Sequence, residues 1–125
     1  MSRILVVDDD RATALLIQDI LVDEGYVVEV AHDGAVAIEL MRVQLPDVVL
    51  VDRRMPVMDG IVFLKACRQE PNWSAVRIVL VSAQAEQVSG AAGFDGFLAK
   101  PFDVVDLLRT VEAAVAYLQV HAVAI

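Results

Sequence analysis

The chain has 125 residues, enough for one domain with a buried core, and its single cysteine, Cys67, excludes an internal disulfide and suits a reducing cytoplasm. The formal net charge of −8 argues against nucleic-acid binding, because phosphate contacts require a positive surface. The mean hydropathy is high, at +0.60, but no apolar run reaches the roughly 18 residues that a membrane-spanning helix requires. We therefore expect a cytoplasmic protein without a signal peptide, which binds neither nucleic acid nor a membrane.

Short runs of β-branched residues alternate along the chain with segments of helical spacing. The expected strands are "RILVV" (3–7), "VVEVA" (27–31), "DVVLV" (47–51), "RIVLV" (77–81) and "GFLA" (96–99). The expected helices lie near 11–24, 34–44, 59–69, 84–92 and 103–118. Asp10, Asp59 and Asp103 stand where helices begin, while Gly25 and Gly93 stand where helices stop. Five strand–helix units predict an α/β fold, with a parallel, doubly wound sheet covered by helices on both faces.

Polar residues follow four of these strands, at the ends where a doubly wound sheet binds its ligands. Asp8 and Asp9 follow the first strand, Asp52 the third, Ser82 the fourth and Lys100 the fifth. Three clustered carboxylates attract a hard divalent cation such as Mg²⁺, and a hydroxyl and an ammonium group opposite them would hold a phosphoryl group. A carboxylate in such a site is also a candidate nucleophile that forms an aspartyl phosphate.

Four motifs carry a resemblance to a known family: "VVDDD", "VDRRMPVMDG", "VSA" and "LAKPF", in this order. Together they closely resemble the receiver domain of two-component response regulators, over residues 3 to about 118. The resemblance implies a flavodoxin-like sheet of strand order 2-1-3-4-5, flanked by five helices. It also implies a signalling role without enzymatic turnover, in which a histidine kinase or a histidine phosphotransfer protein donates a phosphoryl group and the surface offered to partners changes.

The resemblance assigns the acidic residues their roles. It makes Asp52 the phosphoacceptor, and it implies Mg²⁺ or Mn²⁺ as the cofactor. The cation would be bound by Asp9, Asp52 and the backbone carbonyl of Arg54, with Asp8 contributing largely through water.

The same resemblance implies how the phosphoryl group is sensed. Ser82 and Lys100 would contact the phosphoryl oxygens, and Ser82 would be drawn inward when the group is added. Phe97 would then turn inward as the second part of the switch. The family usually has a cis peptide bond at the position of Pro101.

The sequence departs from the family in two places. The stretch between Ser82 and Lys100 is about one helical turn shorter than usual, and its Gly90 weakens a helix, so we expect a short or irregular fourth helix and an altered output face. Arg53 and Arg54 follow the acceptor directly and bring two permanent positive charges to the rim of an acidic pocket. We expect the Arg54 side chain to lie near the phosphoryl group.

The C-terminal part carries a further expectation about partners. Residues 1–120 are assigned to the receiver domain and 121–125 to a C-terminal tail. Apolar residues keep helical spacing at positions 104, 107, 108, 111, 115 and 118, and the apolar sequence "VHAVAI" follows. We expect the fifth helix to contact a downstream effector or a second copy of the chain, or the tail to begin a linker.

Three other functions fit the residues less well. A phosphatase with an aspartyl nucleophile resembles "DxD" after the nucleophile strand, whereas here Arg54 stands at the second acid's position. A flavin- or nucleotide-binding protein would need a glycine-rich phosphate loop, which the sequence lacks. A receiver-like module that never takes phosphate is disfavoured by the intact acid set. Cys67 is interpreted as core filler and His32 as a packing or surface residue.

Overall fold

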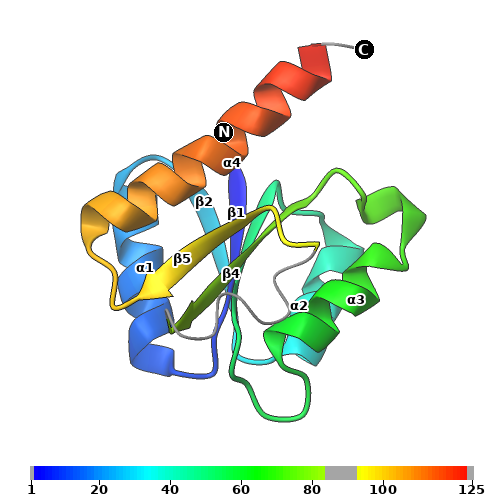
Figure 1. The fold of residues 1–125 in the computed structure, drawn as a ribbon, viewed down its shortest axis with the longest axis horizontal. Helices are drawn as coiled ribbons and strands as arrows, with labels where there is room; N and C mark the ends of the chain where they lie inside the picture. The colour runs from blue at the N-terminus through cyan, green and yellow to red at the C-terminus, as the bar shows by residue number, and fades with distance from the viewer. Residues whose placement is uncertain (1, 84–92, 124–125) are drawn as a thin grey trace.

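The computed structural model of the chain describes residues 2–83 and 93–123 (Figure 1). Five parallel strands form one sheet in the order β2-β1-β3-β4-β5. They are β1 (Arg3–Val7), β2 (Val27–Ala31), β3 (Val48–Asp52), β4 (Arg77–Ala83) and β5 (Gly96–Lys100). The parallel pairing and the strand order confirm the α/β fold predicted from the sequence.

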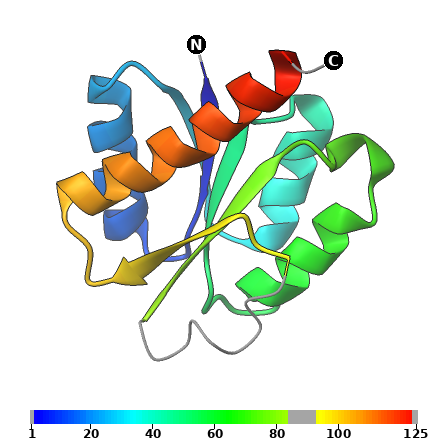
Figure 2. The same ribbon diagram turned by 45° about the horizontal axis from the view of Figure 1, so that its top comes forward.

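Helices cover both faces of this sheet, with α1 and α4 on one face and α2 and α3 on the other (Figure 1, Figure 2). The described helices are α1 (Arg11–Asp23), α2 (Gly34–Val43), α3 (Gly60–Arg68), α4 (Val104–Val123) and one short 3₁₀ helix, η1 (Pro71–Trp73). The helix expected near 84–92 lies outside the described residues. Thus α4 is the helix expected at 103–118, and it runs on to Val123 because no glycine or proline stops it.

The core consists of two apolar layers, one on each face of the sheet. Along β1, Ile4 and Val6 pack toward α1 and α4, whereas Leu5 and Val7 pack toward α2 and α3, as the two-residue period of a strand requires. All five residues of β3 are buried because this strand is central. Cys67, on α3, is fully buried in the core, as expected, and burial raises the pKa of its thiol to about 12. None of the described helices is long and apolar enough to cross a membrane.

Aspartate side chains start the described α-helices. The capping residues are Asp10, Asp33, Asp59 and Asp103. Each carboxylate accepts a hydrogen bond from a backbone N–H of the first turn, a group that has no partner within the helix. At α4 the arrangement is reciprocal, since the backbone N–H of Asp103 also donates to the Asp106 carboxylate at 3.2 Å. The N-caps expected at Asp10, Asp59 and Asp103 are therefore confirmed.

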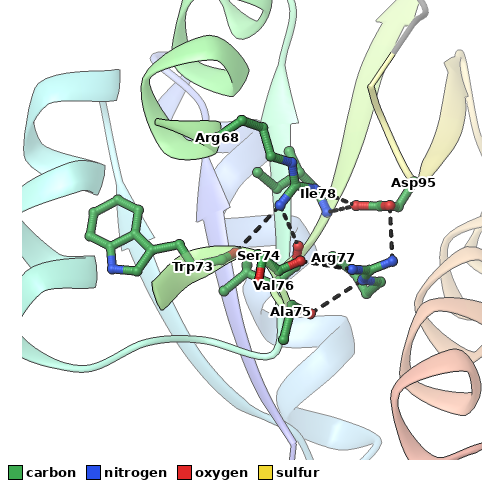
Figure 3. Close-up of polar contacts among 8 residues, drawn as sticks. All are labelled: Arg68, Trp73, Ser74, Ala75, Val76, Arg77, Ile78 and Asp95. Atoms are coloured by element: carbon green, nitrogen blue, oxygen red, sulfur yellow. Dashed lines mark hydrogen bonds and ion pairs between the residues drawn. The ribbon is translucent and has the colours of Figure 1, made fainter. Parts of the chain in front are cut away.

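A charged network around Asp95 joins the amino ends of β4 and β5 (Figure 3). One carboxylate oxygen, Oδ2, accepts hydrogen bonds from the Arg68 guanidinium and the Ile78 backbone N–H, both at 2.8 Å. The other, Oδ1, accepts a hydrogen bond from the Arg77 guanidinium at 3.1 Å. The Arg77 guanidinium also lies over the ring of Tyr117, 4.5 Å from its centroid. The network thus connects α3, β4, β5 and α4 at the amino ends of the strands, at the opposite end from the acidic residues.

Candidate functional site

The structure brings the acidic residues and the lysine together at the carboxyl ends of the strands. Asp8 and Asp9 directly follow β1, while Asp52 and Lys100 are the last residues of β3 and β5. Carboxylate oxygens of Asp8, Asp9 and Asp52 all lie within 4.8 Å of one another. The Lys100 ammonium donates a hydrogen bond to Asp52 Oδ1 at 2.9 Å. Ser82 is the last residue but one of β4 and pairs with Ala99, next to Lys100. The backbones of all five predicted residues therefore lie at the carboxyl ends of the strands.

Burial and the closeness of like charges make the ionised forms of the buried acids in this cluster less favourable. Asp8 and Asp52 are only 2% and 7% exposed, whereas Asp9 faces solvent. Burial raises the pKa of Asp8, and the neighbouring charges of Asp52 and Asp9 raise it further. Burial also raises the pKa of Asp52, and the hydrogen bond and charge of Lys100 offset only part of that rise. Burial alone would lower the pKa of Lys100, but the hydrogen bond and charge of Asp52, with the charges of Asp8 and Asp10, outweigh it, so the net shift is upward. The cluster therefore favours additional positive charge.

Backbone hydrogen bonds hold Asp8 in place. Its N–H donates to the Ala31 carbonyl at 3.0 Å, and its side-chain Oδ1 accepts from the Asp10 N–H at 2.9 Å. Its backbone carbonyl lies 3.1 Å from Nδ1 of His32. His32 was expected to be a packing or surface residue, so this contact was missed. Its position directly after the second strand, at the same edge of the sheet, was the available signal.

The residues expected to form the switch lie on β4 and β5. Ser82 is buried, and its hydroxyl donates to the neighbouring Ala83 carbonyl at 3.4 Å. Phe97 is 37% exposed, and its ring centroid lies 6.2 Å from that of Phe94. The peptide bond between Lys100 and Pro101 is cis, as expected.

The loop between Asp52 and α3 lies tightly against the site. The N–H of Gly60 donates to the Arg53 carbonyl at 2.9 Å, and a Cβ added at Gly60 would stand 2.9 Å from the Asp52 backbone oxygen. Only glycine allows this approach without displacing the backbone of Asp52. Within the loop, Arg54 is exposed, and Val57 is fully exposed with a φ of 69°. A β-branched residue is strained in this left-handed region, which glycine and asparagine adopt more readily.

The three carboxylates suit a magnesium ion. Mg²⁺ prefers oxygen ligands at about 2.0–2.1 Å, so ligands on opposite sides of one ion stand about 4 Å apart. The oxygens of Asp8, Asp9 and Asp52 lie within 4.8 Å of one another, and burial, together with the charge of neighbouring acids, raises the pKa of Asp8 and of Asp52. The donor set and its geometry thus fit a hard divalent cation.

Comparison with known proteins gives a consistent result. Residues 4–112 match the family described as the response regulator receiver domain. The response regulator MprA of Mycobacterium ulcerans is 40% identical over an alignment of 116 positions that covers 89% of this chain and 49% of MprA. MprA of Mycobacterium tuberculosis shows the same identity and coverage. The chain therefore spans about half the length of these curated relatives.

Solved structures show the same fold. The chemotaxis response regulator CheY4 of Vibrio cholerae superposes with a TM-score of 0.84 at 33% identity, covering 91% of this chain and 98% of CheY4. The signal receiver domain of a signal transduction histidine kinase from Syntrophus aciditrophicus gives a TM-score of 0.86 at 26% identity, covering 93% of this chain and 91% of that one. Domains of this kind thus occur in proteins of quite different length and organisation.

We predict that relieving the backbone strain at Val57 stabilises the protein. Val57→Gly removes the cost of the left-handed backbone conformation, about 1–2 kcal/mol. Glycine also makes the unfolded chain more flexible, which offsets part of this gain, so the free energy of unfolding should rise by about 0.5–1 kcal/mol. Val57→Asn should act in the same direction. Urea unfolding monitored by Trp73 fluorescence measures the change.

The matched control is Val36→Gly, at an exposed valine within α2. There, glycine should lower the stability, because it weakens a helix by about 0.5–1 kcal/mol. A loss of stability in Val57→Gly as large as that in the control would contradict the strain at Val57.

Proposed function

The chain belongs to the receiver-domain family of two-component response regulators, and we propose that Asp52 is the residue that accepts the phosphoryl group. The observation that carries this proposal is the 2.9 Å hydrogen bond between Lys100 Nζ and Asp52 Oδ1, next to two further carboxylates. It supports the proposal because the Asp52 carboxylate lies beside an ammonium group on one side and the carboxylates of Asp8 and Asp9 on the other. We propose a histidine kinase or a histidine phosphotransfer protein as the donor and the cytoplasm as the compartment.

The transfer itself needs few protein groups. A carboxylate oxygen of Asp52 forms a bond to phosphorus while the bond between phosphorus and the donor histidine nitrogen breaks, and that nitrogen then takes up a proton. Bound by Asp8, Asp9, Asp52 and the Arg54 carbonyl, Mg²⁺ would neutralise charge on the phosphoryl oxygens. Lys100, already beside Asp52, supplies a second positive charge to the same oxygens. The domain acts on itself and on no separate substrate.

The switch is proposed to run through β4 and β5. A phosphoryl group on Asp52 would offer the Ser82 hydroxyl a charged acceptor in place of its long 3.4 Å bond to the Ala83 carbonyl. Phe97, half-exposed before phosphorylation, would then turn toward the space beside Ser82. The readout is the surface formed by β5 and α4, onto which Phe97 faces.

This surface is proposed to bind a second copy of the chain. Two adjoining grooves, of about 430 and 420 Å³, run between β5 and α4 and share Phe97 and Thr110. Each groove carries one acid and one arginine: Asp95 with Arg77, and Asp106 with Arg109. Two-fold symmetry can set Asp106 of each copy against Arg109 of the other, which favours self-association. The sequence also suggested Val111 as part of this surface, but Val111 is buried against the sheet.

We predict that acetyl phosphate and Mg²⁺ add one phosphoryl group, with a mass increase of about 80 Da, to the native protein. Asp52→Asn should show no adduct, because the nucleophilic oxygen is gone, and chelation of the metal should abolish labelling of the native protein. Asp19→Asn, at an exposed acid of α1, is the control and should label normally. Intact mass spectrometry measures the product, and an adduct that persists in Asp52→Asn would refute the assignment.

We predict that Arg54 prolongs the phosphorylated state. Its guanidinium, two residues after the acceptor, can bind phosphoryl oxygens and keep the hydrolytic water from approaching in line. Loss of a contact worth about 1 kcal/mol corresponds to roughly five-fold faster hydrolysis. Arg54→Ala and Arg54→Asn should therefore lose the phosphoryl group faster at saturating Mg²⁺, whereas Lys65→Ala, at an exposed cation of α3, should not. Equal or slower hydrolysis in both Arg54 variants would rule the role out.

We predict that beryllium fluoride with Mg²⁺, which mimics an acyl phosphate, converts the protein from monomer to dimer in sedimentation velocity. Arg109→Glu should prevent the dimer, because it replaces the arginine of the Asp106–Arg109 groove by a second acid in each copy. Lys65→Glu makes the same charge change on the other face of the sheet and should leave the dimer intact. A monomer at every concentration, with or without the mimic, would contradict self-association.

A further inference from the structure

His32 makes a contact that the proposed chemistry does not use. It directly follows β2, it is half-buried, and its Nδ1 lies 3.1 Å from the backbone carbonyl oxygen of Asp8. A carbonyl oxygen can only accept a hydrogen bond, so Nδ1 must carry the proton and donate. The imidazole is therefore held in one tautomer by the end of β1.

This bond extends the pairing of β1 with β2 beyond the two strands. The ladder pairs Val7 with Ala31, and the N–H of Asp8 still donates to the Ala31 carbonyl at 3.0 Å. After Ala31 the backbone turns toward Asp33, which caps α2. The His32 side chain thus provides the next hydrogen bond at the point where the backbone of β2 leaves the sheet.

The carbonyl that His32 holds belongs to the peptide unit between Asp8 and Asp9. A peptide unit is planar, so fixing its carbonyl also fixes its N–H and the direction in which the next residue begins. Asp9 is exposed, and packing against the core does not hold its side chain, although its carboxylate must face those of Asp8 and Asp52. The orientation of the Asp8–Asp9 peptide therefore decides whether the Asp9 carboxylate faces those of Asp8 and Asp52.

We propose that His32 is a positioning residue for the cation site, which holds the Asp8–Asp9 peptide so that the Asp9 carboxylate faces the other two. The proposal deepens the proposed function and rests on its magnesium site. It assigns His32 no contact with the ion and no part in phosphoryl transfer. Groups that orient metal ligands through a hydrogen bond typically change metal affinity about ten-fold or more when they are removed.

The test measures the Mg²⁺ dissociation constant of the unphosphorylated protein by isothermal titration calorimetry. His32→Leu removes the donor while keeping an apolar side chain of moderate size, and it should weaken binding by about ten-fold. His32→Asn keeps an N–H donor near the position of Nδ1 and should bind within about two-fold of the native protein. His121→Leu removes the only other histidine, in the last turn of α4, and should bind as the native protein does.

Two further measurements separate positioning from a general loss of structure. In nitrogen-detected NMR of the metal-free protein, His32 should be the Nδ1–H tautomer, and the amide signals of Asp9 and Asp10 should shift in His32→Leu but not in His121→Leu. The unfolding temperature in chelator shows how far each variant is destabilised without the ion. Native Mg²⁺ affinity in His32→Leu, or weakened affinity that His32→Asn fails to restore, would overturn the proposal. Absence of Mg²⁺ binding by the native protein would instead refute the proposed magnesium site.

Discussion

Crowded negative charge at one edge of the sheet is the constraint on which the rest of the site depends. Asp8, Asp9 and Asp52 arrive there because parallel strands deliver their carboxyl ends to the same edge, and two of the three are nearly excluded from water. Lys100 supplies one positive charge to this group, and the pKa values of Asp8 and Asp52 remain raised. Any cation that binds only the folded protein relieves this repulsion and adds stability by mass action. Ligand binding and fold stability are therefore coupled at this edge.

The two ends of the strands differ in how well their charges are compensated. At the carboxyl edge, charges are held close together although they repel, and a loop with a strained valine and a closely packed glycine lies beside the acceptor. At the amino edge, Asp95 accepts hydrogen bonds from two arginines and a backbone N–H, so its charge is well compensated (Figure 3). The hydrogen bonds and ion pairs of Asp95 thus stabilise the fold at the amino ends of the strands, while the acids at the carboxyl ends repel one another.

Much of this arrangement could be predicted from the sequence, because the relevant signals are local. Runs of β-branched residues mark the strands, and the polar residue that ends each run marks the site, so Asp52 and Lys100 could be placed together although they are far apart in the chain. The aspartate caps were also local signals. The contact of His32 with Asp8 was different, since it depends on where β2 turns away from β1. A positive φ at Val57 runs against the preference of its residue type, so only the tertiary structure reveals it.

The Asp95 network also sets how β5 is aligned with β4. Asp95 is joined to Ile78 through both its backbone N–H and its carboxylate, and this sets the register in which Ala83 pairs with Lys100. A slip of one residue would turn Lys100 to the opposite face of the sheet and separate it from Asp52. Because the register is set at Asp95, the number of residues between β4 and Asp95 does not affect it. Lys100 would therefore remain beside Asp52 in a chain with a longer or shorter connection between these two points.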